Sequence, residues 1–270
     1  MKKGIPKQFC SIIDYIYRNT TYLIKSGNYY SEGFQTTTGA SQVYKPSSVL
    51  FNLYISNLSK QLHKKGPSIE NVIVNYIQYS DDLALIGRTA IELQNHLEKL
   101  EKHCKNIELE INTNKTKVQI FYKGRLPNAD KQFQFKINEK EIECVQTFTY
   151  LGIVFTCQLS FSKHIEMVNL KARSKIGIIF SKIKTMNLTM QMFLKIFSCY
   201  ILPSFTYGVS IWYDKTSTAS IEATNSIYTK YLKRILSLPQ NTTNFITYSI
   251  SETVPLCLTL KKSMKSSKYK

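Results

Sequence analysis

The sequence of 270 residues predicts an α+β protein. Up to about residue 156, helical patterns mix with runs that alternate apolar and polar residues like strands, and after that point every pattern is helical. Charge changes along the chain as well: residues 1–160 carry 20 Lys and Arg against 14 Asp and Glu, whereas residues 161–270 carry 16 against 4. We therefore predict three regions: a mixed region over 1–156, a basic helical region over 157–260 and a disordered basic tail over 261–270.

Local signals support each expected element. Pro6 and Pro46 favour helix starts, Gly66 favours a helix end, and Thr89 with Glu92 is typical of a capping box. Helices are predicted over 5–20, 46–66 and 89–112 in the first region and over 160–183, 189–213 and 220–238 in the second. Strands are predicted over 71–79 and 83–87 and, as parts of an antiparallel sheet, over 115–124, 132–143 and 147–155.

The composition restricts the partners and the compartment. A net charge of +18 favours a polyanionic partner, nucleic acid before an anionic membrane surface, although a solvated basic surface is the alternative. The six cysteines form no C-x-x-C pair, which indicates reduced thiols. No secretory signal is recognisable, and no apolar run reaches the roughly 18 residues that a membrane span needs. We expect a soluble intracellular protein, in the nucleus or the cytoplasm, with no membrane partner.

The segment VNYIQYSDDLALIG places Asp81 and Asp82 side by side between two strand-like runs. At a tight turn both carboxylates can crowd one end of a hairpin, where they repel each other unless a cation lies between them. Magnesium is a hard cation that prefers such oxygen ligands, and metal ions of this kind serve phosphoryl transfer. The alternative is an ordinary polar turn, because Asp is a common turn residue.

Other segments stand in a fixed order around YSDD. They are GIPKQFCSIIDYIYRNTTYLIKSGNYYSEGFQTTTGASQ (4–42), LEINTNKTKVQIF (109–121), TFTYLGIVF (147–155), LSFSKHIEMVNLKARSKIGII (159–179) and YILPSFTYGVSIWY (200–213). YSDD resembles the Y-x-D-D box of the reverse transcriptases of non-LTR, LINE-type retrotransposons. In the same order the other segments resemble that family's lead-in to the nucleotide-binding motif, its Asn-x-x-Lys-Thr-Lys segment, its primer grip, the start of its thumb and its V-x-P-x-L-x-Y-G-x-x-x-W segment. The resemblance covers about residues 3–256.

This resemblance implies a partial polymerase palm, an antiparallel sheet with packed helices, followed by a basic helical thumb. The implied reaction is RNA-directed DNA synthesis on an RNA template and a DNA primer, with deoxynucleoside triphosphates as substrates in an intact enzyme. Asp81 and Asp82 would be catalytic and would hold Mg²⁺ or Mn²⁺. Lys115 would donate a proton to pyrophosphate, and Gln42 would contact the nucleotide.

Further roles follow for the nucleic acid. Leu151 and Gly152 would form the primer grip, and Tyr79 could stack on a base. A helical stripe of basic residues would run along the phosphate backbone of a duplex: Lys163, Lys171, Arg173 and Lys175. The alternatives are an ordinary turn at Leu151 and Gly152, a half-buried core tyrosine, and a loop amide at Gln42.

The chain departs from the family pattern in two places. Val43 stands where the nucleotide motif has glycine, and a β-branched residue cannot make the same close backbone approach without strain. The family's box with a third catalytic aspartate precedes the helix at which this chain opens, and Asp14 is a poor substitute because it lies on that helix. We therefore expect an N-terminally truncated chain that polymerises little or not at all alone. The alternatives are a non-catalytic nucleic-acid-binding remnant, a domesticated protein, or a decayed reading frame.

Overall fold

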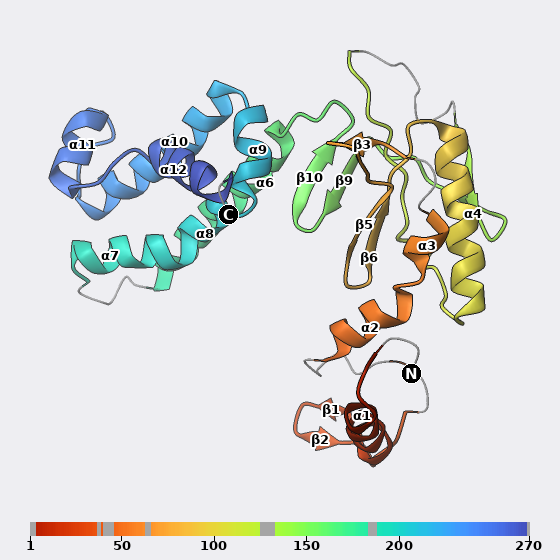
Figure 1. Ribbon diagram of the computed structural model, residues 1–270. Helices are drawn as coiled ribbons and strands as arrows, with labels where there is room; N and C mark the ends of the chain where they lie inside the picture. Colours follow the sequence, from red (N-terminus) through yellow and green to blue (C-terminus); the bar gives the residue numbers. More distant parts are fainter. Residues whose placement is uncertain are drawn as a thin grey trace. The chain divides into compact units, whose positions relative to one another are not determined.

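The computed structural model describes residues 4–36, 39, 46–62, 66–124, 133–182 and 188–268. By their internal contacts, residues 1–103 and 104–270 form two compact units, called unit 1 and unit 2 below. Figure 1 labels helices and strands of both units and colours them by their place in the sequence. Helices and short antiparallel hairpins occur in both units, so the predicted α+β class is confirmed. The boundary predicted near residue 156 stays a prediction, although the last strand ends at Thr156 and the described elements after it are helical.

Unit 1 combines helices with three small hairpins. Its elements are α1 (Lys7–Asn19), β1 (Lys25–Ser26), β2 (Tyr29–Tyr30), α2 (Ser47–Ile55), α3 (Leu58–Leu62), β3 (Ser68–Ile69), β4 (Val72–Ile73), β5 (Tyr76–Tyr79), β6 (Asp82–Leu85) and most of α4 (Ala90–Asn106), whose last residues, from Cys104, belong to unit 2. Strands pair in chain order as β1–β2, β3–β4 and β5–β6. Leu58 and Leu62 on α3 and Leu97 and Leu100 on α4 are buried, whereas α1 contributes no buried residue.

Two predicted elements of unit 1 are interrupted in the structure. The helix expected over 46–66 breaks after Ile55, where the Ser56 hydroxyl donates a 2.8 Å hydrogen bond to the Leu53 carbonyl. A serine side chain that bonds to a nearby backbone carbonyl competes with the backbone hydrogen bonds of the helix, and serine therefore favours turns. The strand expected over 71–79 breaks at Asn75, which is buried and donates from its side chain to the Leu62 carbonyl. A side-chain hydrogen bond thus accompanies each break, while the Asn75 carbonyl still accepts from the Ile86 N–H at 2.8 Å.

Helix α4 begins with the capping box that the sequence predicts. The Thr89 hydroxyl accepts from the Glu92 N–H at 3.2 Å. In return, the Glu92 carboxylate accepts from the backbone N–H of Arg88 at 2.8 Å, one residue before the expected partner. These bonds satisfy donors that a helix start leaves unpaired.

We expect Thr89→Ala to lower the free energy of local unfolding at the start of α4 by about 1 kcal/mol, because the cap acceptor is lost. Hydrogen exchange over residues 90–97 measures this change. Thr89→Ser keeps the hydroxyl and is the matched control. Equal exchange in the two variants would show that the hydroxyl does not cap the helix.

Unit 2 begins with two hairpins and continues as a helical assembly. Its elements are β7 (Phe135–Ile137), β8 (Lys140–Ile142), β9 (Thr147–Tyr150), β10 (Ile153–Thr156), α6 (Ser162–Lys182), α7 (Met190–Ile196), a π-helical turn η1 (Phe197–Ile201), α8 (Leu202–Thr206), α9 (Val209–Trp212), a 3-10 turn η2 (Tyr213–Lys215), α10 (Thr218–Ile235), α11 (Asn244–Ser251) and α12 (Leu256–Lys268). The strands pair as β7–β8 and β9–β10. One hydrophobic core joins β10, α6, η1, α8, α9, α10 and α12.

The helix predicted over 189–213 is a bent series of segments. Pro203 lies in the first turn of α8, where its missing N–H is tolerated, and Gly208 adopts φ 60° between α8 and α9. No single helix of the described residues is long and apolar enough to cross a membrane; Met190–Thr206 and Val209–Lys215 meet the length and composition only as a pair, bent by 47°. Both halves of this pair supply buried core residues, among them Phe205 and Trp212.

The described end of the chain, up to residue 268, differs from the disordered tail expected over 261–270. Helix α12 continues to Lys268, and it buries Leu256, Leu260 and Met264 in the core of unit 2. These residues lie four apart and therefore share one helix face. The lysines and serines between them dilute this apolar pattern in the sequence.

Candidate functional site

Asp81 and Asp82 lie at the turn of the β5–β6 hairpin, as the sequence predicts. Tyr79 pairs with Asp82, so Ser80 and Asp81 form a two-residue loop. Ser80 has φ 54°, a left-handed conformation that costs a non-glycine residue energy and often marks functional sites. The Gln78 side chain braces this loop by donating to the Ser80 carbonyl at 3.2 Å and to the Asn52 side-chain oxygen at 3.2 Å.

Both aspartates of this turn are exposed and have no counter-charge within the part of the chain that the structure describes. Among the residues that the structure describes, neither carboxylate has a hydrogen bond or an ion pair, although the chain is strongly basic. Their oxygens are the ligands that Mg²⁺ prefers, so the pair fits two ligand positions of a hard cation. Within the described ranges, no group of three His, Cys, Asp or Glu side chains is placed to hold a metal ion.

The residues predicted to contact the nucleotide lie in different parts of the chain. Tyr79 is 65% exposed at the end of β5, so it is not the core tyrosine of the alternative interpretation. Lys115 lies in unit 2, in a turn where its backbone N–H donates to the carbonyl and the side-chain oxygen of Asn112, both at 3.2 Å. Asp81 and Asp82 lie in unit 1. Gln42 and Val43 lie outside the described residues.

The predicted primer grip is a hairpin turn between β9 and β10. Tyr150 pairs with Ile153, which leaves Leu151 and Gly152 as a two-residue loop. Both have positive φ, 45° and 78°, the combination that a type I′ turn requires. The twist of such a turn matches that of the strands, so this loop forms a tight hairpin. The Leu151 carbonyl accepts a 2.7 Å hydrogen bond from the Tyr207 hydroxyl.

The four basic residues predicted to form a stripe on α6 do not share one face. Lys171 and Arg173 are both exposed. However, residues two positions apart on an α-helix point in directions about 200° apart, so these two side chains lie on opposite faces. Lys163 donates to the Thr147 hydroxyl at 3.3 Å. Lys175 donates to the Ser204 hydroxyl at 2.7 Å and to the Tyr200 carbonyl at 3.2 Å, so its amine links α6 to η1 and α8. Lys171 and Lys175, which are four residues apart, are the two that lie closest together on one face of the helix.

His164 is a residue whose part in this region the sequence did not reveal. It is buried on α6, and its Nδ1 accepts from the Val154 N–H at 3.4 Å, which joins α6 to β10. Burial, and then the positive charge of Lys171, lower the pKa of His164, which favours the neutral ring that can accept this bond. Its Nε2 has no hydrogen-bond partner in the described part of the chain. A lone histidine in a helix of mixed polarity carries no sequence signal for such a contact.

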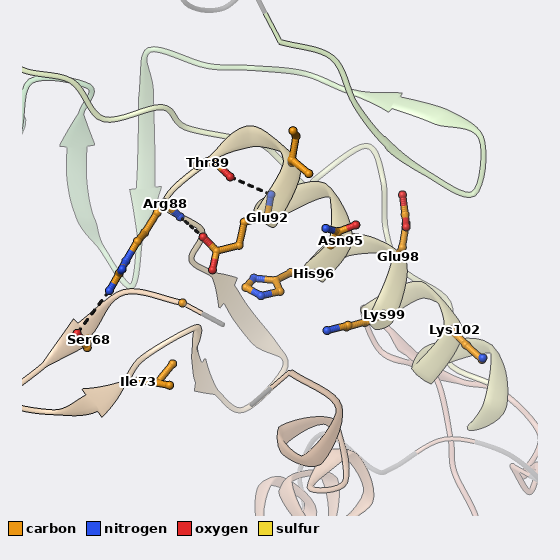
Figure 2. Close-up of a pocket in the computed structure, with 12 residues that line it drawn as sticks. Ser68, Ile73, Arg88, Thr89, Glu92, Asn95, His96, Glu98, Lys99 and Lys102 are labelled. Carbon is orange, nitrogen blue, oxygen red and sulfur yellow. Dashed lines mark hydrogen bonds between the residues drawn. The ribbon is translucent and has the colours of Figure 1, made fainter. Parts of the chain in front are cut away.

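An open cavity of about 1000 Å³ lies in unit 1 between α4 and the β3–β4 hairpin (Figure 2). Figure 2 shows Arg88 reaching Ser68 and Glu92 turning back to the Arg88 backbone, and both contacts are hydrogen bonds, of 3.4 and 2.8 Å. The cavity wall mixes cations with carboxylates. None of the predicted site residues lines it, so the cavity is separate from the aspartate hairpin.

Comparison with known proteins adds independent information to this geometry. Residues 3–155 match the family described as "Reverse transcriptase (RNA-dependent DNA polymerase)", which covers more than half of the chain. The chain belongs to the reverse transcriptase family. The matched range contains both the Asp81–Asp82 turn and the Leu151–Gly152 turn of this reverse transcriptase chain.

Curated relatives are proteins of retrotransposable elements. The chain is 28% identical over 160 residues to the retrovirus-related Pol polyprotein from type-2 retrotransposable element R2DM of Drosophila melanogaster, which covers 57% of the chain and 15% of the relative. It is 22% identical over 247 residues to the RNA-directed DNA polymerase from mobile element jockey of the same species, 88% of the chain and 26% of the relative. A third relative, the Pol polyprotein from type-1 retrotransposable element R2 of Bradysia coprophila, is 32% identical over 117 residues, 41% of the chain and 14% of the relative.

These relatives confirm the predicted non-LTR type of reverse transcriptase. The chain spans between 14% and 26% of the length of the three relatives. Their similarity to the chain therefore concerns one part of much larger proteins.

Proposed function

We propose that this chain carries the Y-x-D-D part of a non-LTR reverse-transcriptase active site and binds an RNA template paired with a DNA primer. The observation that carries the proposal is the Asp81–Asp82 turn: two exposed carboxylates without a counter-charge among the described residues, within the range that matches the family. In this proposal the β5–β6 and β9–β10 hairpins belong to a polymerase palm. Helix α6 and the helices after it form the thumb.

Asp81 and Asp82 would hold Mg²⁺ or Mn²⁺. When bound, such an ion neutralises phosphate charge and polarises the oxygens that react in phosphoryl transfer. The chain's own contribution is to hold two carboxylates together on a braced turn. A two-metal centre needs more oxygen ligands than this pair supplies, and no third acidic, His or Cys side chain joins it in the described ranges. We therefore propose that the isolated chain extends a primer poorly or not at all.

Binding of the primer–template would rest on unit 2. This unit carries 24 Lys and Arg against 10 Asp and Glu, a net charge of +14, whereas unit 1 carries 12 against 8. Lys171 and Arg173 are exposed on α6 and can approach phosphates. Lys163 and Lys175 already donate to groups within the unit, so we assign them a smaller share of the binding.

Primer extension tests the catalytic half of the proposal. The full chain is incubated with an RNA template, a DNA primer, magnesium and all four deoxynucleotides, beside Asp81→Ala. We expect little or no extension by either protein. Extension that vanishes in Asp81→Ala would contradict the proposed inactivity and show that the chain completes its own metal site.

A non-catalytic nucleic-acid-binding protein is the second candidate, and the concentration of charge in unit 2 favours it. Both candidates predict binding that weakens with salt, and Lys171→Gln should reduce the slope of log affinity against log salt by about 1. Lys171→Arg keeps the charge and should restore the slope. A slope that Lys171→Gln leaves unchanged would remove this residue from the interface.

Dependence on the metal site separates the two candidates. Fluorescence anisotropy of a labelled primer–template gives the affinity with and without magnesium. Equal affinity of the wild type and Asp81→Ala under both conditions, without any extension, favours the non-catalytic candidate. Tighter binding of a matched deoxynucleotide that needs both magnesium and Asp81 favours the polymerase site.

A further inference from the structure

We infer that Tyr207 is a positioning residue, which holds the Leu151–Gly152 turn in the orientation that receives the primer end. This inference rests on the proposed function. Tyr207 belongs to the Y-G-x-x-x-W segment, Tyr207–Trp212, whose residues contact no substrate in the proposal above. The structure places this segment directly against the turn.

The contact between Tyr207 and the turn involves both its hydroxyl and its ring. The hydroxyl donates to the Leu151 carbonyl at 2.7 Å, across 56 residues of sequence. A Cβ atom on Gly152 would lie 3.4 Å from Cε1 of the Tyr207 ring, so the ring lies close against the second turn residue. Tyr207 therefore touches both residues of the predicted primer grip.

Tyr207 is itself fixed from the core of unit 2. Its carbonyl accepts from Nε1 of Trp212 at 3.0 Å, and Trp212 is 1% exposed. Its backbone N–H donates to the Pro203 carbonyl at 3.1 Å. The next residue, Gly208, lies so close to β10 that a Cβ there would be 2.5 Å from Cδ1 of Ile153. The hydroxyl that holds the turn thus extends from a rigid support.

The exposure of this contact distinguishes positioning from simple packing. Tyr207 is 56% exposed, and Gly152 is exposed as well, so a nucleic acid can reach the turn. One hydrogen bond at the surface is a small part of the stability of a whole unit, so its loss should act on the order of the turn and not on folding. A tyrosine needed only for packing would be buried, as Tyr231 is at 1% exposure.

Tyr231 supplies a matched control for the experiment. Its hydroxyl also donates to a backbone carbonyl, that of Phe193, at 2.7 Å. Tyr207→Phe and Tyr231→Phe therefore delete the same group from the same kind of bond at different places in unit 2. If the hydroxyl of Tyr207 only stabilised the unit, both variants would change binding in the same way.

Two measurements are made on the full-length wild type and both variants. Hydrogen exchange over residues 147–156 reports the order of the β9–β10 hairpin. Anisotropy compares a primer–template with a recessed 3′ end with a blunt duplex of the same sequence. We expect Tyr207→Phe to increase exchange at the turn and to weaken binding of the recessed end by about threefold to tenfold, the range for one lost hydrogen bond. Binding of the blunt duplex should not change, and Tyr231→Phe should leave both results at the wild-type level.

The outcomes separate this inference from the proposed function. If the wild type binds the recessed end and Tyr207→Phe binds it equally well, the positioning role is overturned while the proposed function stands. Unchanged exchange over 147–156 in Tyr207→Phe overturns the positioning role as well. If the wild type does not bind primer–template at all, the proposed function falls and the primer role with it, and increased exchange then assigns Tyr207 to hairpin order alone.

Discussion

Replacing Trp212 by alanine is expected to lower the free energy of unfolding of unit 2 by about 3–5 kcal/mol, the usual cost of truncating a buried tryptophan. Trp212 is 1% exposed within the core that joins β10 to the helices. Its ring lies 6.1 Å from that of His164, and its Nε1 donates to the Tyr207 carbonyl at 3.0 Å. The substitution removes packing and leaves that carbonyl without its donor.

Urea unfolding followed by circular dichroism measures this loss, because Trp212 is the chain's single tryptophan and the tryptophan fluorescence signal is lost with it. Trp212→Phe is the control that retains an aromatic ring while removing Nε1. We expect Trp212→Phe to lower the free energy of unfolding by clearly less than Trp212→Ala does. An alanine variant within about 1 kcal/mol of the wild type would contradict the central place of Trp212 in this core.

Gly208→Ala is expected to destabilise unit 2 by about 2–5 kcal/mol through two effects. A left-handed φ of 60° costs a non-glycine residue about 1–2 kcal/mol. The added Cβ would lie 2.5 Å from Cδ1 of Ile153, and overpacking of this kind costs about 1–3 kcal/mol. Because Ile153 begins β10, the strain also falls on the strand that follows the Leu151–Gly152 turn.

Gly177→Ala is the matched control for this prediction. Gly177 lies within α6, and nothing lies within 4 Å of the position that its Cβ would take. Alanine should therefore stabilise the helix by about 0.5–1 kcal/mol. Thermal unfolding should show opposite shifts for the two variants. A shift of the same sign in both would mean that close packing and φ do not explain the need for glycine at position 208.

Much of the local structure could be predicted from the sequence. Alternating apolar residues on both sides of Ser80–Asp81 predicted the β5–β6 hairpin, which the structure has. The pattern over 147–155 predicted a single strand, and only the resemblance implied a hairpin at Leu151–Gly152; the structure divides this run into β9 and β10. The Thr89–Glu92 capping box was equally readable, because its bonds span three or four residues. Signals of this kind depend on neighbours in the chain, so a single sequence contains them in full.

Predictions failed where partners distant in sequence decide the outcome. Helix α12 reaches Lys268 because Leu260 and Met264 find a core to pack against, although the segment alone is too polar to predict this. The basic residues of α6 differ for the same reason. Lys175 donates to Ser204, 29 residues away, and a count of charges in the sequence cannot distinguish it from the exposed Lys171.

By itself, the sequence determined the family, the two hairpin turns and the acidic pair at Asp81–Asp82. Only the tertiary structure decided which groups hold those turns in place. The hydrogen bond from Tyr207 to Leu151 and the packing of Gly208 against Ile153 join segments about 55 residues apart. Such contacts depend on how helices α8 and α9 pack against the β9–β10 hairpin, and packing of this kind leaves no periodic pattern in either segment.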